Sequence, residues 1–328
     1  MLRRTAALAL TMLAAPGAAA QVDTTRVNHS AIAFTVNEKD LLPENVAHDP
    51  VDGSFYVGST RKGKIVRVDS SRRVSDFVPA GGDGVWMIVG MKIDPARRLL
   101  WANTSAASNL VGLEKKDEGR AALLAYDLRT GRRVARVELA DGKPHFFNDL
   151  VVLASGDVVL TDMAGGALYR LRQGARTLEA IAAPGSLTGP NGIAAAPDGA
   201  SFYVAQRGAI ARVRAADGSV APLAHPDSIA VGGIDGLYLH DGSLIAVQGG
   251  RRRVVRLSLD SGGDRLNGIE VLEANHPIFM NPTTGVVVGD DFYYIANSQF
   301  DSFDAEGRLF PLERLYEVVV LRVPLRAR

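Results

Sequence analysis

Residues 191–213 read NGIAAAPDGASFYVAQRGAIARV, and this stretch shows most clearly the pattern from which we predict the fold. It consists of a polar residue with Gly, a short apolar strand, a Pro-Asp-Gly turn, an aromatic-rich strand and a third strand that ends in Arg-Val. Short apolar runs with frequent turn signals predict antiparallel strands that are joined by tight turns. Helical patterns with a period of about 3.6 are hard to find anywhere after residue 21.

Five further copies of this unit occur along the chain. Aligned on the residue before the first strand, the six copies begin at positions spaced 45, 59, 43, 44 and 49 residues apart, namely Glu44, Val89, Asn148, Asn191, Asp235 and Thr284. Repeats of about 40 to 50 residues that contain four short strands are typical of β-propeller blades. We therefore predict an all-β, six-bladed β-propeller of four-stranded blades, which forms a single domain over residues 21–328.

Ring closure and two long loops follow from the same alignment. The last unit lacks a fourth strand after residues 318–323, and residues 31–36 have the composition to pair there and remove the open sheet edge. Residues 105–120 and 298–314 exceed the blade plan, and their polar and Gly content predicts loops. Long loops on a propeller commonly form the walls of a site.

The N-terminal segment predicts export. Arg3 and Arg4 precede an apolar run at 6–15 and a small-residue site at 18–20, which is the layout of a signal peptide cleaved after Ala20. This run is too short to span a bilayer, and no later segment approaches the necessary length. We therefore expect residues 1–20 to be a signal peptide and the protein to be periplasmic or secreted, with no membrane span.

Composition narrows the possible chemistry. The chain has 37 Lys and Arg against 36 Asp and Glu, so its formal charge of +1 gives no argument for nucleic acid as a partner. It has no Cys, which excludes disulfides, thiolate metal sites and a cysteine nucleophile. We expect a monomer whose partner is a small molecule.

The aligned positions predict a metal site. The inner strand of each blade starts beside the central tunnel, so equivalent residues converge there. Four of them carry a carboxylate or amide oxygen: Glu44, Asn148, Asn191 and Asp235. Asn-Gly and Asp-Gly can instead be ordinary turn dipeptides, but the hairpin turns come downstream, for example at 197–199. Two carboxylates and two amides suit a hard divalent cation.

These residues also carry a family resemblance. The pairs Glu44-Asn45, Asn148-Asp149, Asn191-Gly192 and Asp235-Gly236 resemble the metal-site positions of the senescence marker protein/gluconolactonase family, which includes regucalcin. The resemblance covers nearly the whole mature chain. It implies one divalent cation, foremost Ca²⁺, with Mg²⁺, Mn²⁺ and Zn²⁺ as alternatives. It further implies direct ligation by Glu44, Asn191 and Asp235, with Asn148 as a ligand or a substrate contact.

The activity implied by the resemblance is hydrolysis of a lactone or related ester. The cation would polarise the carbonyl oxygen, and Asp235 would take a proton from the attacking water. Sugar-lactone members are expected to have Arg two residues before the third-blade Asn, where this chain has Phe146. The acidic residue expected shortly after Thr161-Asp162-Met163 is also missing. Phe146 and Phe147 instead predict an apolar wall and a more hydrophobic substrate.

Further side chains are expected at the tunnel mouth. His145 is either a loop histidine bonded to a neighbouring carbonyl or a proton shuttle. Second strands of the blades end at the mouth, which adds several polar side chains. The predicted substrate-binding residues are His145, Phe146, Phe147, Asn103, Asp162, Arg207 and Asn297. A non-catalytic binding propeller with a structural metal ion remains the alternative, because fold alone does not choose between these functions.

Overall fold

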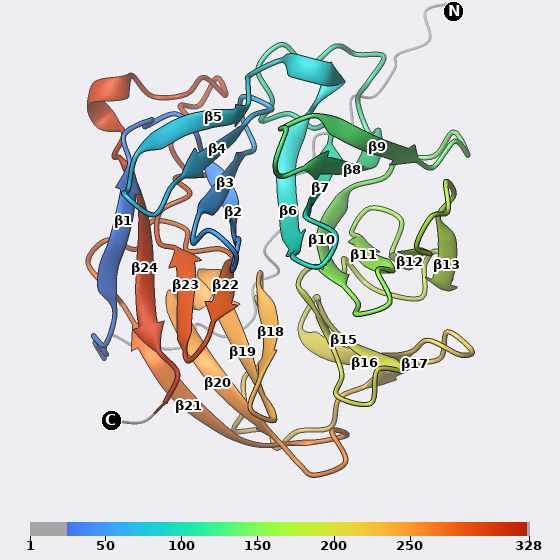
Figure 1. Ribbon diagram of the computed structural model, residues 1–328. Helices are drawn as coiled ribbons and strands as arrows, with labels where there is room; N and C mark the ends of the chain where they lie inside the picture. The colour runs from blue at the N-terminus through green and yellow to red at the C-terminus, as the bar shows by residue number, and fades with distance from the viewer. Residues whose placement is uncertain (1–24, 327–328) are drawn as a thin grey trace, which may run out of the picture.

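A computed structural model describes residues 25–326, which form six antiparallel sheets of four strands each, arranged in a ring (Figure 1). The predicted six-bladed propeller is therefore confirmed. No helix in the described part of the chain is long and apolar enough to cross a membrane. The predicted signal peptide, residues 1–20, lies outside the described residues and stays a prediction.

The first three blades follow one another in sequence, each running from its innermost to its outermost strand. Blade 1 contains β2 (Pro43–His48), β3 (Phe55–Ser59), β4 (Ile65–Val68) and β5 (Val74–Val78). Blade 2 contains β6 (Met87–Asp94), β7 (Leu99–Ser105), β8 (Ala121–Asp127) and β9 (Arg133–Glu138). Blade 3 contains β10 (Phe147–Val152), β11 (Val158–Asp162), β12 (Ala167–Leu171) and β13 (Glu179–Ala182).

The last three blades repeat the pattern. Blade 4 contains β14 (Ile193–Ala195), β15 (Ser201–Gln206), β16 (Ala209–Arg214) and β17 (Val220–Pro222). Blade 5 contains β18 (Leu237–His240), β19 (Ser243–Gln248), β20 (Arg253–Leu259) and β21 (Leu266–Ala274). Blade 6 contains β22 (Gly285–Val288), β23 (Asp291–Ile295), β24 (Val318–Pro324) and, last in space, β1 (Ala31–Val36). Within residues 25–326, three single-turn 3-10 helices connect strands: η1 (Gly82–Gly84), η2 (Gly249–Arg251) and η3 (Leu312–Arg314).

The ring closes through the N-terminal strand, as predicted. β1 pairs antiparallel with β24, with Phe34 opposite Val320 and Val36 opposite Val318. Phe34 and Val36 are buried in an apolar cluster that includes Phe55 of blade 1. The pairing satisfies the edge of β24, and the packing joins blade 6 to blade 1.

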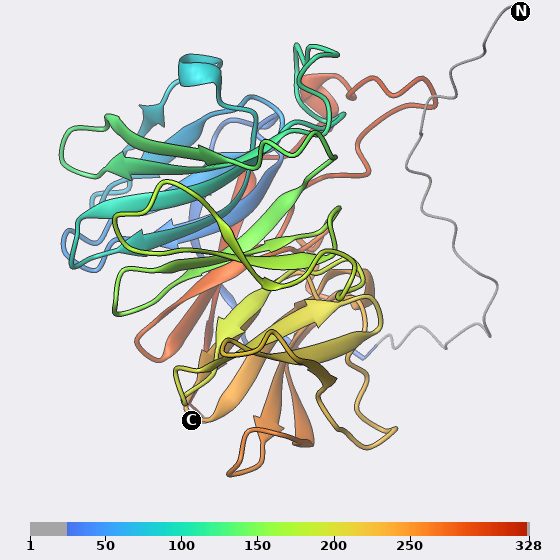
Figure 2. The same cartoon turned by 90° about the vertical axis from the view of Figure 1, so that its right-hand side faces the viewer.

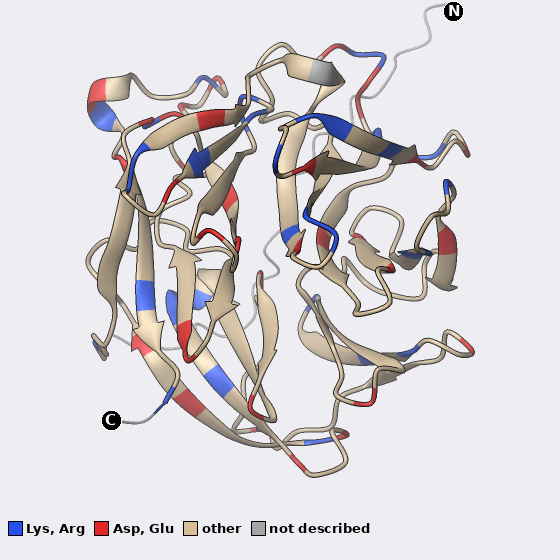
Figure 3. Cartoon of the chain, viewed as in Figure 1, with Lys and Arg blue, Asp and Glu red and all other residues tan. Residues whose placement is uncertain are grey.

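Apolar clusters between neighbouring blades form the core. Between blades 1 and 2, for example, Tyr56, Ile88, Met91 and Leu100 are almost completely buried together. Charged residues appear mainly in turns and along outer strands such as β9 and β21, whereas most of the sheet surface is uncharged (Figure 3). Burial of these alternating apolar side chains is the main stabilising contribution to the ring.

The two faces of the propeller have different connections. Inner strands begin at one face, here called the mouth face, and the hairpins between first and second strands lie on the opposite face. The long loops 106–120 and 298–314 follow second strands, so they belong to the mouth face, and Figure 2 shows them on the same side of the molecule. The N–H of Val111 donates to the carbonyl of Arg61 (2.8 Å), and the Arg61 guanidinium lies 6.0 Å from the centre of the Phe303 ring. Both loops therefore contact blade 1 at the mouth.

Candidate functional site

The aligned positions of blades 1–3 lie at a break in strand pairing. The regular register is interrupted between Pro43 and Val46, between Ile88 and Met91, and between Phe147 and Leu150. Glu44, Val89 and Asn148 fall inside these three breaks. A bulge redirects a side chain locally without ending the strand. The same irregularity therefore recurs at the same point of three successive blades.

In blades 4–6 the aligned residues stand just before the inner strand but are still bonded to the second strand. The N–H of Asn191 donates to the Ala205 carbonyl at 2.8 Å, and the N–H of Asp235 donates to the Val247 carbonyl at 2.9 Å. The carbonyl of Thr284 accepts from Ile295 at 3.0 Å. The six positions therefore correspond in the blades, although only Glu44, Val89 and Asn148 lie within an assigned strand.

Asn191 and Asp235 meet because their blades approach closely. A Cβ at Gly192 would lie only 2.5 Å from the carbonyl oxygen of Asp235, so the absence of a side chain allows this approach. The amide Nδ2 of Asn191 donates to Oδ1 of Asp235 at 3.2 Å. The other amide atom, Oδ1 of Asn191, is buried and has no hydrogen-bond partner among the described residues.

Burial raises the pKa of both Glu44 and Asp235, and the charge of Asp235 also acts on Glu44. Burial, followed by the nearby charges of Asp235 and Asp149, raises the pKa of Glu44 from 4.5 to about 8, against a hydrogen bond from Asn148 that lowers it. Burial also raises the pKa of Asp235 from 3.8 to about 6, against the hydrogen bond from Asn191. Both carboxylates therefore lack compensating positive charge when they are ionised.

These four residues fit a divalent cation. The buried, unpartnered amide oxygen of Asn191 needs a donor or a cation, and the charged forms of Glu44 and Asp235 are disfavoured without one. Asn148 contributes a second amide beside Glu44. Thr284 has a different role, because its hydroxyl donates to the carbonyl of Glu44 at 2.6 Å and so fixes the backbone of blade 1.

Sequence reasoning missed a second layer of polar residues that adjoins this set. The carboxylate of Asp149 is 1% exposed and pairs with Lys92, whose Nζ lies 3.0 Å from Oδ1. The same ammonium group lies 5.4 Å from the centre of the Tyr238 ring. Lys92 therefore forms an ion pair with Asp149, whereas neither Glu44 nor Asp235 has an ion-pair partner among the described residues. Asp149 directly follows Asn148, which was the one available signal in the sequence.

His145 is held between two carboxylates. Its Nδ1 lies 2.6 Å from Oδ2 of Asp162, and its Nε2 lies 2.9 Å from Oδ1 of Asp141. Burial alone would lower the pKa of His145, but the hydrogen bonds with Asp162 and Asp141 outweigh it and raise the pKa above 6.5. Oδ1 of Asp162 accepts from the N–H groups of Phe146 and Gly165. Both ring nitrogens of His145 are thus occupied, and neither binds a carbonyl group.

Three other predicted substrate-binding residues are engaged in contacts within the fold. Asn103 donates to the carbonyl of Asp149 at 3.1 Å. Asn297 donates to the carbonyl of Glu317 and accepts from the N–H of Val319, both at 2.7 Å. Phe147 is fully buried in the core between blades 2 and 3. Of the predicted set, Arg207 is exposed and Phe146 is partly exposed, so these two can reach a ligand without rearrangement.

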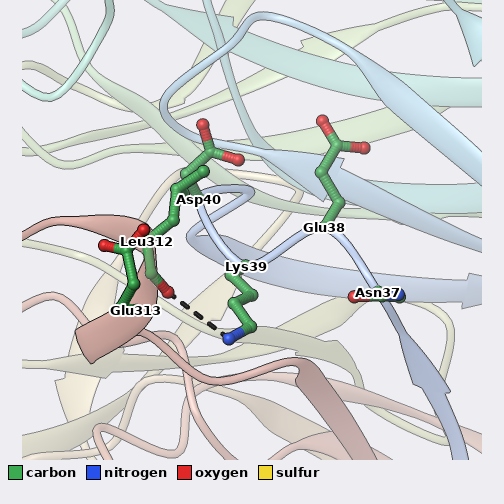
Figure 4. A pocket seen from close by; sticks show the side chains of 6 residues that line it. All are labelled: Asn37, Glu38, Lys39, Asp40, Leu312 and Glu313. Carbon is green, nitrogen blue, oxygen red and sulfur yellow. Dashed lines mark hydrogen bonds between the residues drawn. The ribbon is translucent and has the colours of Figure 1, made fainter.

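A surface pocket of about 350 Å³ lies away from all these residues. It is formed by the segment 37–40 after β1 and by η3 (Figure 4). Nζ of Lys39 donates to the carbonyl of Leu312 at 3.4 Å across it, and nearby Glu38 and Asp40 pair with Lys62. None of the predicted site residues lines this pocket.

Comparisons with known proteins support the fold. No family model and no curated protein sequence matches the chain. A gluconolactonase from Xanthomonas campestris is similar in structure at 16% identity, with a TM-score of 0.62 over 92% of this chain and 94% of that one. The PQQ-bound form of an aldose sugar dehydrogenase from Streptomyces coelicolor is similar at 14% identity and a TM-score of 0.58, over 90% and 98% of the two chains. A virginiamycin B lyase from Staphylococcus aureus is similar at 12% identity and a TM-score of 0.60, over 90% and 100%. At such identities the similarity establishes the propeller fold alone.

Proposed function

We propose that the chain is a metal-dependent hydrolase that opens a lactone or related ester at the tunnel mouth. The proposal rests on Glu44 and Asp235, two buried acids of blades 1 and 5, of which Asp235 raises the pKa of Glu44, and on the amides of Asn148 and Asn191 beside them. Nδ2 of Asn191 donates to Asp235, a hydrogen bond from Asn148 lowers the pKa of Glu44, and Oδ1 of Asn191 is buried without a hydrogen-bond partner among the described residues. A gluconolactonase among the structurally similar proteins is consistent with this activity.

The four residues would hold one divalent cation, with Ca²⁺ as the first candidate because all donors are oxygen. When bound, such an ion supplies Lewis-acid stabilisation of the negative charge that develops on a carbonyl oxygen. The pKa of Asp235, about 6, leaves its carboxylate mostly ionised at neutral pH and able to accept a proton from water. The Asn191 amide donates a hydrogen bond to Oδ1 of Asp235.

The second oxygen of Asp235 has space beside Gly249. A Cβ at position 249 would lie 2.6 Å from Oδ2 of Asp235, so Gly leaves this oxygen accessible to a small molecule or to the cation. We propose Phe146 and Arg207, at the mouth face, as the substrate contacts, which favours an apolar lactone with a polar edge. An ester is the preferred target because its alkoxide leaving group needs little assistance.

Chelator-treated protein that is reloaded with Ca²⁺, Mg²⁺, Mn²⁺ or Zn²⁺ should be assayed on sugar, acyl and aryl lactones. We expect metal-dependent turnover that Asp235→Asn reduces by at least about 100-fold, since general base catalysis contributes on this order. Asp217→Asn, a change in an exposed turn, is the matched control and should leave turnover unchanged. Metal-independent hydrolysis, or full activity of Asp235→Asn, would overturn the proposal.

A non-catalytic binding propeller is the second candidate. It is favoured by the hydrogen bonds of Asp162 and Asn297, which occupy polar groups that a substrate would otherwise use. In that case the ion would stabilise the fold without turnover on any lactone. Metal-dependent thermal stability together with no hydrolysis across the panel would select this function.

We further propose that residues 1–20 direct export to the periplasm or the medium and that the mature chain is a monomer. Mass spectrometry of the protein recovered after secretory expression should show Gln21 as its first residue. Light scattering should give the mass of one mature chain.

A further inference from the structure

A second polar cluster lies on the face opposite the mouth, at two neighbouring hairpins. The hairpin between β18 and β19 turns through Asp241 (φ 43°) and Gly242 (φ 69°), and Asp-Gly is a favoured pair for a turn with two positive φ angles. The hairpin between β22 and β23 turns through Gly289 (φ 59°) and Asp290. Both loops contain only two residues, so the side chains at these tips are held on short, well-defined turns.

His240 faces two carboxylates at this place. Its Nε2 lies 3.7 Å from Oδ2 of Asp241 and 3.7 Å from Oδ1 of Asp290. The same Nε2 atom is buried, and it makes no hydrogen bond with any described residue. Within residues 25–326, this is the one group of three His or acidic side chains whose ligand atoms lie within 4.8 Å of one another.

We propose that His240, Asp241 and Asp290 form a binding site for a borderline divalent transition metal, of which Zn²⁺ is the first candidate. Ligand atoms about 2.0 to 2.1 Å from a tetrahedral Zn²⁺ lie about 3.4 Å apart, which is close to the two distances of 3.7 Å. One imidazole with two carboxylates favours such an ion over Ca²⁺, which prefers oxygen alone. Three protein ligands leave a fourth position for water.

The surroundings of the cluster agree with this assignment. The His240 side chain is 13% exposed, whereas Asp241 is 75% and Asp290 is 41% exposed, so the carboxylates give an ion a path from solvent. Nε of Arg326 lies 2.9 Å from Oδ1 of Asp290 and orients this carboxylate from outside. With a neutral imidazole, Asp241, Asp290 and Arg326 leave a net charge of −1.

At the corresponding junction between blades 1 and 2, an ion pair joins the two hairpins. There the first-to-second-strand hairpins are joined by Asp49 and Arg98, with nitrogen–oxygen distances of 2.6 and 2.5 Å. A guanidinium supplies the cation at that junction. Between blades 5 and 6, Nε2 of His240 makes no hydrogen bond with a described residue, and a metal ion would link blade 5 to the closing blade there.

The experiment uses the full mature chain after chelator treatment, titrated with Zn²⁺ against a competing indicator dye. We compare wild type with His240→Gln, Asp241→Asn and the control His225→Gln. Asp241→Asn retains a residue suited to its turn, so it keeps the test valid if His240→Gln fails to fold. The variant Glu44→Gln lacks a proposed ligand of the tunnel site, so a loss of Zn²⁺ binding in this variant identifies Zn²⁺ that binds in the tunnel. Crystals soaked in Zn²⁺ and measured at the zinc absorption edge locate the ion.

We expect His240→Gln and Asp241→Asn each to lower the affinity for one equivalent of Zn²⁺ by at least about tenfold, since loss of even a residue that supports a metal ligand lowers metal affinity this much. Wild type, His225→Gln and Glu44→Gln should retain that equivalent. An anomalous peak should lie within bonding distance of Nε2 of His240. Unchanged Zn²⁺ binding in both variants, or no peak at His240, would overturn the proposal. These readouts do not involve turnover, so they are independent of the proposed function.

Discussion

Replacing Glu44 by Gln removes the carboxyl group whose pKa burial raises from 4.5 to about 8. The folded, metal-free protein therefore binds this proton more tightly than the unfolded chain between about pH 4.5 and pH 8. In that window the free energy of unfolding falls as pH rises. The loss attributable to Glu44 is about 1 kcal/mol at pH 5, about 3 kcal/mol at pH 7 and nearly 5 kcal/mol above pH 8.

Gln resembles the protonated carboxyl group but does not ionise, so it causes no loss of stability as pH rises. We expect metal-free Glu44→Gln to be more stable than wild type by about 3 kcal/mol at pH 7 and by about 1 kcal/mol or less at pH 5. Urea unfolding with a chelator present, at several pH values, measures this difference. Exposed Glu118→Gln is the control and should change stability by less than about 0.5 kcal/mol. Added Ca²⁺ should stabilise wild type but not Glu44→Gln.

A destabilising effect of Glu44→Gln that is the same at pH 5 and pH 8 would contradict a raised pKa of Glu44. It would mean that Glu44 contributes through packing or a hydrogen bond rather than as a buried, uncompensated carboxylate. Equal stabilisation of both proteins by Ca²⁺ would remove Glu44 from the proposed ligand set.

Three further predictions concern the fold. Asp49→Ala leaves Arg98 without its buried partner and should lower the free energy of unfolding by about 2 to 3 kcal/mol in urea, less than for a fully buried pair because Arg98 is 35% exposed. Phe34→Ala removes a buried side chain from the closing strand and should cost about 3 kcal/mol and promote aggregation, measured by urea unfolding and light scattering. His145→Gln removes an imidazolium whose pKa the carboxylates Asp162 and Asp141 raise, so its destabilising effect should be full below about pH 6.5 and should shrink as pH rises through the folded-state pKa, measured by thermal melts. A pH-independent effect of His145→Gln would contradict the ion-pair interpretation.

The sequence predicts the architecture well because a propeller repeats the same local pattern in every blade. Strand order within the blades explains the spacing of the six units and the closing role of residues 31–36. It also determines on which face the long loops lie. The meeting of Asn191 with Asp235 follows for the same reason, since equivalent positions on a ring approach one axis.

Pairings between side chains from different blades are harder to anticipate. Lys92 and Asp149 are 57 residues apart, and nothing in the repeat indicates that the Lys side chain reaches the next blade. Asn103 and Asn297 look like free polar groups at strand ends, yet each satisfies backbone groups of a neighbouring segment. A closed ring of sheets has many such strand ends, and their buried N–H and C=O groups require partners.

The repeat pattern does not predict the cluster at His240 either, because this cluster also joins two blades. Its ligand atoms come from two hairpins about 50 residues apart in sequence, and Asp-Gly at 241–242 resembles an ordinary turn. Only the placement of blades 5 and 6 beside each other brings Asp290 to the imidazole.

The proposed cation site can be tested by calorimetric titration of the chelator-treated protein with Ca²⁺ in two buffers of different ionisation enthalpy. With pKa values of about 8 for Glu44 and about 6 for Asp235, binding should release about one proton per ion at pH 7 and about two at pH 5. Asp235→Asn should abolish binding, and the Ca²⁺-loaded wild type should hydrolyse a lactone. Absence of binding, or binding that releases no protons and survives in Asp235→Asn, would contradict a cation site in the tunnel.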